Sequence, residues 1–131
     1  MKVIVITTDN KMSVKEIENN LGNMVDIVKG YIEPVYPNYA YEDRTMIRGN
    51  CFICDEEGLL KEKPINYLGT LLYNGIHNND ILHPIAGDIF ICGCDREDFR
   101  GVSDGEIEFY QNKFGNLLKR INGIGEEEKN V

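Results

Sequence analysis

The chain has 131 residues, of which 42% are hydrophobic, and its 14 basic and 22 acidic side chains give a formal net charge of −8. Residues 1–50 carry 6 basic and 7 acidic side chains, whereas residues 51–131 carry 8 and 15, so the acidity belongs to the second half. A surface this negative repels phosphate backbones, which disfavours a conventional DNA- or RNA-binding protein. No apolar run approaches the roughly 20 residues of a membrane span, and no secretory leader is evident. We therefore expect one soluble, cytoplasmic domain.

The first elements are predicted to be a strand and a helix. Residues 2–8 form a β-branched run that alternates little, which is typical of a strand buried on both faces. Ser13-Val-Lys-Glu16 has the pattern of a helix capping box, and Gly30 is expected to end the helix. An apolar stripe at spacings of three and four connects the two ends. Its members are Val14, Ile17, Leu21, Met24, Val25 and Val28.

The middle of the chain predicts an antiparallel pair of strands. Residues 31–36 are extended in pattern, but Pro34 lacks a backbone donor and confines this strand to an edge of the sheet. Residues 37–43 have no periodicity and predict a loop, after which extended structure resumes and runs through residues 51–54. Residues 55–58 predict the next turn, whose glycine is expected to take a positive φ.

The second half predicts two helices and a strand. Asn66 is a candidate N-cap for a short helix that ends at Asn74-Gly75, and a polar loop follows it. Residues 88–94 form the last predicted strand. Ser103-Asp-Gly-Glu106 is a second capping box, which opens a C-terminal helix. The apolar residues of that helix are Ile107, Tyr110, Phe114, Leu117, Leu118 and Ile121.

These elements define an α+β fold of about four mainly antiparallel strands, with three helices packed on the sheet. We assign residues 1–122 to this domain and residues 123–131 to a charged, flexible tail. The spacing of positions 107, 110, 114, 117 and 121 also fits a seven-residue repeat, so two interpretations stay open: packing on the protein's own sheet, or a homodimer through the C-terminal helix.

The four cysteines form two close pairs, Cys51-Phe-Ile-Cys54 and Cys92-Gly-Cys94. A disulfide framework is not expected in a chain without a secretory leader. Four thiolates could hold a structural zinc ion, but in strands positions 51 and 54 point to opposite faces while 92 and 94 share one. The prevailing prediction is therefore four buried free thiols with no metal.

No motif supports catalysis. The sequence has no G-x-S-x-G, no phosphate-binding glycine loop and no H-E-x-x-H, and the polar loop with His77, Asp80 and His83 is interpreted as solvated. We predict a protein that is not an enzyme and needs no cofactor.

The tyrosines are the more suggestive feature. Seven tyrosines occur without any tryptophan, and a tyrosine ring offers a flat apolar body with a polar tip. One hypothesis is a small-ligand pocket, while the alternative is that the cluster only supports a loop against the sheet. The residues of the small-ligand hypothesis are Tyr31, Tyr36, Tyr39, Tyr41 and Asn66.

Four short stretches, in this order, resemble a small, largely uncharacterised domain family carried by phages, prophages and conjugative elements. They are Val28-Lys-Gly-Tyr-Ile-Glu33, Asp55-Glu-Glu-Gly-Leu-Leu60, Pro64-Ile-Asn66 and Ile85-Ala-Gly-Asp-Ile89. Together with the first strand and the second capping box, the resemblance spans most of residues 1–120. It implies an accessory protein that binds and inhibits a component of the host bacterial cell.

Three modes of action are open for such a protein. In the first, an acidic surface binds a host protein, such as a defence nuclease or CRISPR effector. The residues expected on this surface are Asp55, Glu56, Glu57, Asp95, Glu97, Asp98 and Glu106. In the second, the tyrosine pocket sequesters a small nucleotide signal. In the third, the domain is a structural or regulatory module with a four-cysteine zinc site.

Overall fold

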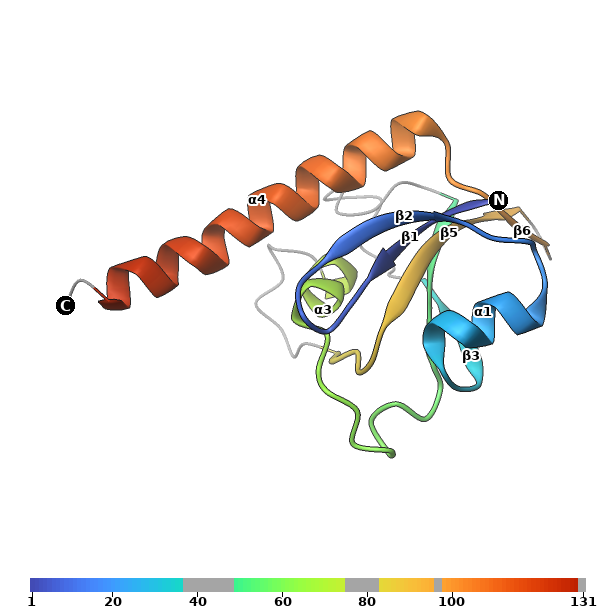
Figure 1. Cartoon of the computed structure of the whole chain (residues 1–131), viewed down its shortest axis with the longest axis horizontal. Helices are drawn as coiled ribbons and strands as arrows, with labels where there is room; N and C mark the ends of the chain where they lie inside the picture. The colour runs from blue at the N-terminus through green and yellow to red at the C-terminus, as the bar shows by residue number, and fades with distance from the viewer. Residues whose placement is uncertain (37–48, 75–82, 96–97, 130–131) are drawn as a thin grey trace.

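A computed structural model of the chain describes residues 1–36, 49–74, 83–95 and 98–129 (Figure 1). Its centre is an antiparallel sheet of six strands with the order β2-β1-β5-β4-β3, and β6 pairs with the end of β5. The strands are β1 (Lys2–Ile6), β2 (Met12–Glu16), β3 (Ile32–Val35), β4 (Asn50–Asp55), β5 (Ile89–Asp95) and β6 (Asp98–Arg100). The helices are α1 (Leu21–Val28), α3 (Tyr67–Asn74) and α4 (Asp104–Lys129). The α+β class is confirmed, with six strands rather than about four.

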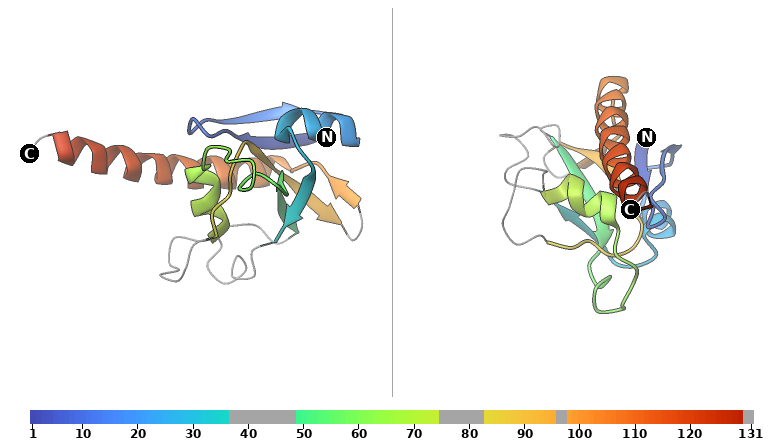
Figure 2. Two further views of the ribbon diagram at one scale, coloured as in Figure 1. Left: turned by 90° about the horizontal axis from the view of Figure 1, so that it is seen from below. Right: turned by 90° about the vertical axis from the view of Figure 1, so that its left-hand side faces the viewer.

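Helices cover both faces of the sheet (Figures 1 and 2). α3 and α4 pack on one face, over a core that includes Ile4, Phe52 and Ile91. α1 packs on the other face, over a core that includes Val5 and Phe90. Because alternate residues of β1 enter different cores, the whole of Val3–Ile6 is buried. This explains the apolar run that predicted a strand covered on both sides.

The first capping box is a wrong prediction, because Ser13–Glu16 belongs to strand β2 and not to a helix. β2 pairs antiparallel with β1, with Val5 opposite Ser13. The hairpin turns at Asn10, whose positive φ of 63° is tolerated by asparagine. Once this turn forms, the hydrogen bonds of the strand ladder satisfy the backbone groups that the capping box would have satisfied.

α1 therefore begins later than predicted, at Leu21. The side chain of Asn20 accepts a hydrogen bond from the Asn23 amide at 2.8 Å and caps the helix. Met24, Ile27 and Val28 form the buried face, whereas Leu21 and Val25 of the predicted stripe are exposed. The helix ends at Val28, and Lys29, not the expected Gly30, caps it in the left-handed conformation.

β3 lies at the edge of the sheet, as Pro34 predicted, and pairs antiparallel with β4. The turn after β4 differs from its prediction. Gly58 does not have a positive φ, and a side chain there would instead collide with the Ala86 carbonyl oxygen at 2.8 Å. The predicted loop 37–43 lies outside the described residues.

The predicted cap of α3 is confirmed. Asn66 accepts a hydrogen bond from the Gly69 amide at 2.9 Å. Its own amide nitrogen donates to the carbonyl oxygens of Ile6, at 2.9 Å, and Gly87, at 3.0 Å. One buried side chain therefore fastens the start of α3 to two other segments.

The second capping box is also confirmed. Glu106 accepts from the Ser103 amide at 2.9 Å, and Ser103 accepts from the Glu106 amide at 3.2 Å. The apolar stripe of α4 packs on the protein's own core as far as Leu118, so that part is not free for a second copy. The helix runs to Lys129, past the expected start of the tail, and extends well beyond the sheet (Figure 2).

Two predictions about the cysteines are wrong: the absence of a disulfide and the presence of four free thiols. Cys51 forms a disulfide with Cys94, with their Cα atoms 6.3 Å apart, so only Cys54 and Cys92 are free thiols. Cys54 points into the core on the α3 side, whereas Cys51 and Cys92 lie on the α1 side. This alternation was predicted from strand geometry, and it prevents all four sulfur atoms from meeting at one ion.

None of the helices, within the described residues, combines the length and apolarity needed to cross a bilayer.

Candidate functional site

The four stretches that carried the family resemblance meet at one end of the sheet. The Glu56 amide donates to the Tyr31 carbonyl oxygen at 2.8 Å, which joins the first stretch to the second. The Asn66 amide donates to the Ile85 carbonyl oxygen at 2.8 Å, which joins the third to the fourth. Segments that are far apart in the sequence thus form one continuous structure, which we call the motif end (residues 28–33, 55–66 and 85–89).

Asp55 is the electrostatic centre of the motif end. Its carboxylate is buried and lies 2.6 Å from Lys63 Nζ and 3.1 Å from Lys61 Nζ, and it accepts from the Glu57 amide at 2.9 Å. Burial raises the pKa of this carboxyl, but these hydrogen bonds and charges outweigh burial and lower the pKa to about 2. Asp55 is therefore a structural anion that fixes the turn.

Lys63 connects this turn to α1. Its Nζ donates to the carbonyl oxygens of Val28, at 3.0 Å, and Lys29, at 2.9 Å, in addition to its ion pair with Asp55. The last carbonyls of a helix lack partners within it, and a lysine is a suitable donor for them. Gly30 is needed beside this cluster, since a Cβ atom there would collide with the Asp55 carboxyl group.

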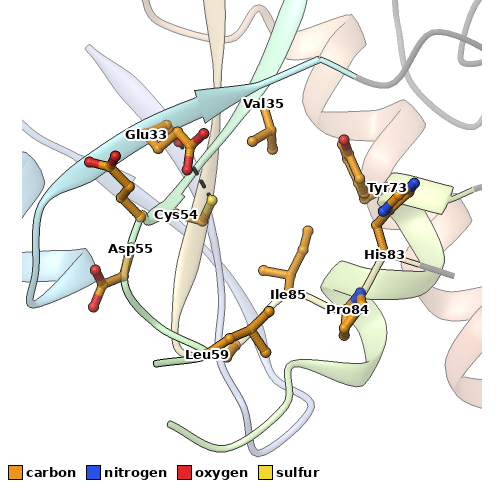
Figure 3. A pocket seen from close by; sticks show the side chains of 11 residues that line it. Glu33, Val35, Cys54, Asp55, Leu59, Tyr73, His83, Pro84 and Ile85 are labelled. Carbon is orange, nitrogen blue, oxygen red and sulfur yellow. Dashed lines mark hydrogen bonds between the residues drawn. The ribbon is translucent and has the colours of Figure 1, made fainter. Parts of the chain in front are cut away.

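A cavity of about 220 Å³ opens beside the turn (Figure 3). In Figure 3, Glu33 and Cys54 lie on the side of the strands, and Tyr73, His83 and Pro84 face them from across the cavity. The apolar part of the lining consists of Val35, Leu59, Pro84, Ile85 and Ala86. Asp55 belongs to the lining, but its carboxylate is directed away from the cavity toward its lysines.

The polar groups of this cavity carry no activated nucleophile. Burial, followed by the nearby charges of Glu33 and Asp55, raises the pKa of the Cys54 thiol to about 11. Burial, Cys54 and Glu33 likewise raise the pKa of Tyr73 above its ordinary value. Both groups are therefore protonated at neutral pH. Glu33 thus disfavours a negative charge on either of these two groups.

Glu33 and Glu56 supply carboxylates to the same cavity, and both residues are exposed. Among the described residues, no lysine, arginine or histidine lies within ion-pair distance of either carboxylate. An apolar cavity with unneutralised acids at its rim suits an elongated cation, whose stem is buried and whose charged end reaches the rim.

A second hollow, which is more open to solvent, adjoins this cavity. We call the first the deeper cavity and the second the shallower hollow. It has a volume of about 650 Å³ and shares Glu56 with the first cavity. Three exposed apolar side chains line it: Leu21 and Val25 of α1, and Tyr31, of which 69% is accessible. Lys61 Nζ lies 5.9 Å from the centroid of the Tyr31 ring and so covers part of this surface. Leu60, on the intervening turn, is 86% exposed.

The predicted acidic surface is only partly present. Glu106 is 8% exposed and Asp55 is 6% exposed, so neither belongs to it. Glu56 and Asp98 are exposed, and Glu57 is half-buried. The side chain of Asp95 and the whole of Glu97 lie outside the described residues. Of the acids that the structure describes, Glu56 and Asp98 lie at opposite ends of the β4–β5 pair, so these two do not form one patch.

Glu106 has a structural role instead. Arg100 Nη1 donates to its carboxylate at 2.9 Å, Asn50 also donates to it, and the Tyr110 hydroxyl donates to Asn50 at 3.0 Å. Burial raises the pKa of Glu106, but hydrogen bonds from Arg100, Ser103 and Asn50 lower it to about 2. This network fastens α4 to the sheet, so Glu106 is not available to a partner.

The residues of the small-ligand hypothesis do not share one cavity. Tyr31 lines the shallower hollow and Tyr36 is exposed, whereas Asn66 is fully buried under α3. Tyr39 and Tyr41 lie outside the described residues. The aromatic side chain in the deeper cavity is Tyr73, which sequence analysis had placed only in a helix.

Sequence reasoning also missed Glu33, Cys54 and His83 as neighbours. The signal that could have brought them together was the resemblance itself, because Glu33 ends the first stretch and Cys54 precedes the second. His83 stands two residues before the fourth stretch.

Comparison with known proteins identifies one matching family. A family model described as a domain of unknown function, DUF3846, matches residues 1–115 and so includes both hollows. No curated protein and no solved structure matches the chain significantly.

Proposed function

We propose that this chain, which belongs to the DUF3846 family of domains of unknown function, acts by binding a protein partner at the motif end. The partner presents an exposed lysine or arginine to the cavity beside Glu33 and Glu56, and apolar side chains to the adjacent hollow. The observation that carries the proposal is the apolar cavity with Glu33 and Glu56 at its rim, for which the described part of the chain supplies no ion-pair partner.

The size of the cavity supports a single side chain as its occupant. About 220 Å³ is below the range of roughly 300–1,000 Å³ that is usual for sites of drug-sized ligands. Interfaces are commonly dominated by a few side chains that fill such pockets, among them arginine. An aliphatic stem would contact Val35, Leu59 and Ile85, while the charged end would lie near the glutamates.

The adjacent hollow supports a protein rather than a free amino acid or amine. Leu21, Val25 and Tyr31 extend the apolar surface beyond the cavity. Leu59 and Leu60, on the turn after β4, are exposed as well. Contiguous exposed apolar groups rimmed by polar residues are characteristic of protein interaction sites. The net charge of −8 would also accelerate encounters with a basic partner.

The same charge pattern disfavours a nucleotide in the deeper cavity, since phosphate groups would approach Glu33 and Glu56 without a described cation between them. The resemblance to a domain family carried by phages and other mobile elements supports a component of the host cell as the partner. It also supports inhibition of that component as the effect of binding. In this proposal, the motif end replaces the dispersed acids as the inhibitory surface, and no catalytic step is involved.

The experiment is capture of partners from a bacterial lysate with a tagged chain and two variants. Glu33→Gln/Glu56→Gln removes the rim charges, while Glu18→Gln/Glu108→Gln is the matched control, because it removes two exposed acids elsewhere. We expect a partner that the wild type and the control retain, that the rim variant loses, and that raised salt weakens. Equal retention by all three proteins would contradict the proposed surface.

A further inference from the structure

Three of the four cysteines form a compact group of sulfur atoms at the opposite end of the sheet from the deeper cavity. The Sγ atoms of Cys51, Cys92 and Cys94 all lie within 4.8 Å of one another. Cys51 and Cys92 are fully buried and Cys94 is half-buried. Nothing in the proposed function uses this group.

Strand pairing explains why the three sulfur atoms meet. Cys51 of β4 stands directly opposite Cys92 of β5, so their side chains project from the same face of the sheet. Cys94 is two residues further along β5 and shares that face because the side-chain period of a strand is two. The backbone of two central strands therefore holds the group in place, as a preformed ligand set requires.

One of the three sulfur pairs already has the spacing of ligands around one metal ion. Cys51 Sγ lies 3.8 Å from Cys92 Sγ. Two sulfur atoms that each lie about 2.3 Å from a shared ion are separated by about 3.8 Å in a tetrahedral site and about 4.0 Å in a trigonal one. This pair needs almost no change for an ion to be bound, whereas Cys51 and Cys94 are joined in the disulfide and must move apart after reduction.

From this geometry we propose that the reduced form of the protein binds one thiophilic d¹⁰ metal ion, Zn²⁺ or Cu⁺, through Cys51, Cys92 and Cys94. Thiolates select these ions over harder cations. Cu⁺ is satisfied by three sulfur ligands, whereas Zn²⁺ takes a fourth ligand from solvent beside the half-buried Cys94. Within the part of the chain that the structure describes, no histidine, carboxylate or fourth cysteine joins the group.

The disulfide between Cys51 and Cys94 makes the site conditional on reduction. A phosphine reductant breaks the S–S bond, takes an oxygen atom from water to become the phosphine oxide, and leaves the two water protons on the two thiols. Binding of the ion then releases the three thiol protons to solvent as three metal–sulfur bonds form. The disulfide and the metal-bound form are thus alternative states of one site.

The test uses the full chain, reduced with a phosphine and freed of reductant under anaerobic conditions. Co²⁺ serves as the spectroscopic probe for the zinc arm, and Cu⁺ in competition with a colorimetric chelator serves as the copper arm. We expect one ion per chain, with thiolate-to-cobalt charge-transfer absorption in the first arm. The oxidised chain is expected to bind neither ion.

Two variants provide a matched comparison, because Cys54 and Cys92 are both buried free thiols but lie on opposite faces of the sheet. Cys92→Ala is expected to lose the bound ion, and Cys54→Ala is expected to retain it. Circular dichroism reports whether each variant is folded. Should Cys92→Ala not fold, alkylation of the wild type decides: the ion must protect Cys94 and leave the reactivity of Cys54 unchanged.

No ion taken up by the reduced wild type in either arm would overturn the proposal. So would equal loss of binding in Cys54→Ala and Cys92→Ala, or an unchanged alkylation rate at Cys94 when the ion is added. None of these outcomes depends on the motif end. The proposed metal site and the proposed protein-binding surface are therefore tested independently of each other.

Discussion

Replacing Asp55 with asparagine keeps the shape of the side chain and removes the charge at the centre of the motif end. In the folded protein the pKa of this carboxyl is about 2, against an ordinary value of 3.8. At about 1.4 kcal/mol per pKa unit, the difference corresponds to about 2–3 kcal/mol of folding free energy. We therefore expect Asp55→Asn to lower the free energy of unfolding at pH 7 by about 2–3 kcal/mol.

The loss should depend on pH in a defined direction. A carboxyl whose pKa is lowered by folding stabilises the protein above its unfolded pKa, and that stabilisation disappears as the pH falls through the folded pKa. The gap between the wild type and Asp55→Asn should thus be constant above about pH 4 and close toward pH 2.

Urea unfolding at a series of pH values measures this gap. Asp26→Asn is the matched control, because Asp26 is exposed on α1, and its effect should stay within about 0.5 kcal/mol. Unfolding of Asp55→Asn like the wild type at pH 7, or a deficit that is the same at pH 2 as at pH 7, would contradict a structural role of the Asp55 charge.

Three further tests by urea unfolding address two contacts of the motif end and one network at the start of α4. Lys63→Met should destabilise the protein by about 2 kcal/mol and Lys61→Met by less than about 1 kcal/mol, since only Lys63 also serves the last carbonyls of α1; equal losses would contradict that role. Gly30→Ala should cost roughly 1–3 kcal/mol because its Cβ meets Asp55, whereas Gly105→Ala, with open space around it in α4, should be neutral or stabilising; similar effects of the two would count against the close approach. Glu106→Gln should destabilise at pH 7 by about 3 kcal/mol, with a deficit that closes as the pH falls toward 2, and a deficit independent of pH would rule out the charge as its cause.

The elements with strong local signals were predicted correctly. These elements are the apolar run of β1, the cap at Asn66 and the capping box at Ser103. The run is buried along its length, and each cap bonds a backbone amide three residues away, so the local sequence is enough to predict all three. Pro34 likewise placed β3 at an edge, because a missing donor excludes the interior of a sheet.

The errors have a different physical origin, which is competition from distant segments. Ser13–Glu16 has the residues of a capping box, but the turn at Asn10 makes it the partner of β1. Gly58 was predicted to be glycine because of a positive φ in a turn. It is required instead because a side chain there would collide with Ala86, which is far away in the sequence. Neither competitor is visible in a local pattern.

The candidate site was harder to predict than the fold, because its parts come from four separate segments. In the sequence, Glu33 is recognisable only as part of an edge strand and Tyr73 only as part of a helix. The fold places both in the lining of one cavity. The negative charge of the chain was visible in the composition, but burial removes Asp55 and Glu106 from the surface, and composition contains no information on burial.

Recognition of a basic side chain of a partner protein by the cavity beside Glu33 and Glu56 can be measured directly. The measurement is a titration of ¹⁵N-labelled protein with N-acetyl-arginine amide, compared with N-acetyl-citrulline amide, which has nearly the same shape without the charge. We expect amide shifts at Cys54, Glu56 and Ile85 with the arginine compound, and much smaller ones with the citrulline compound or in the Glu33→Gln/Glu56→Gln variant. Equal shifts with both compounds, or none at these residues, would contradict it.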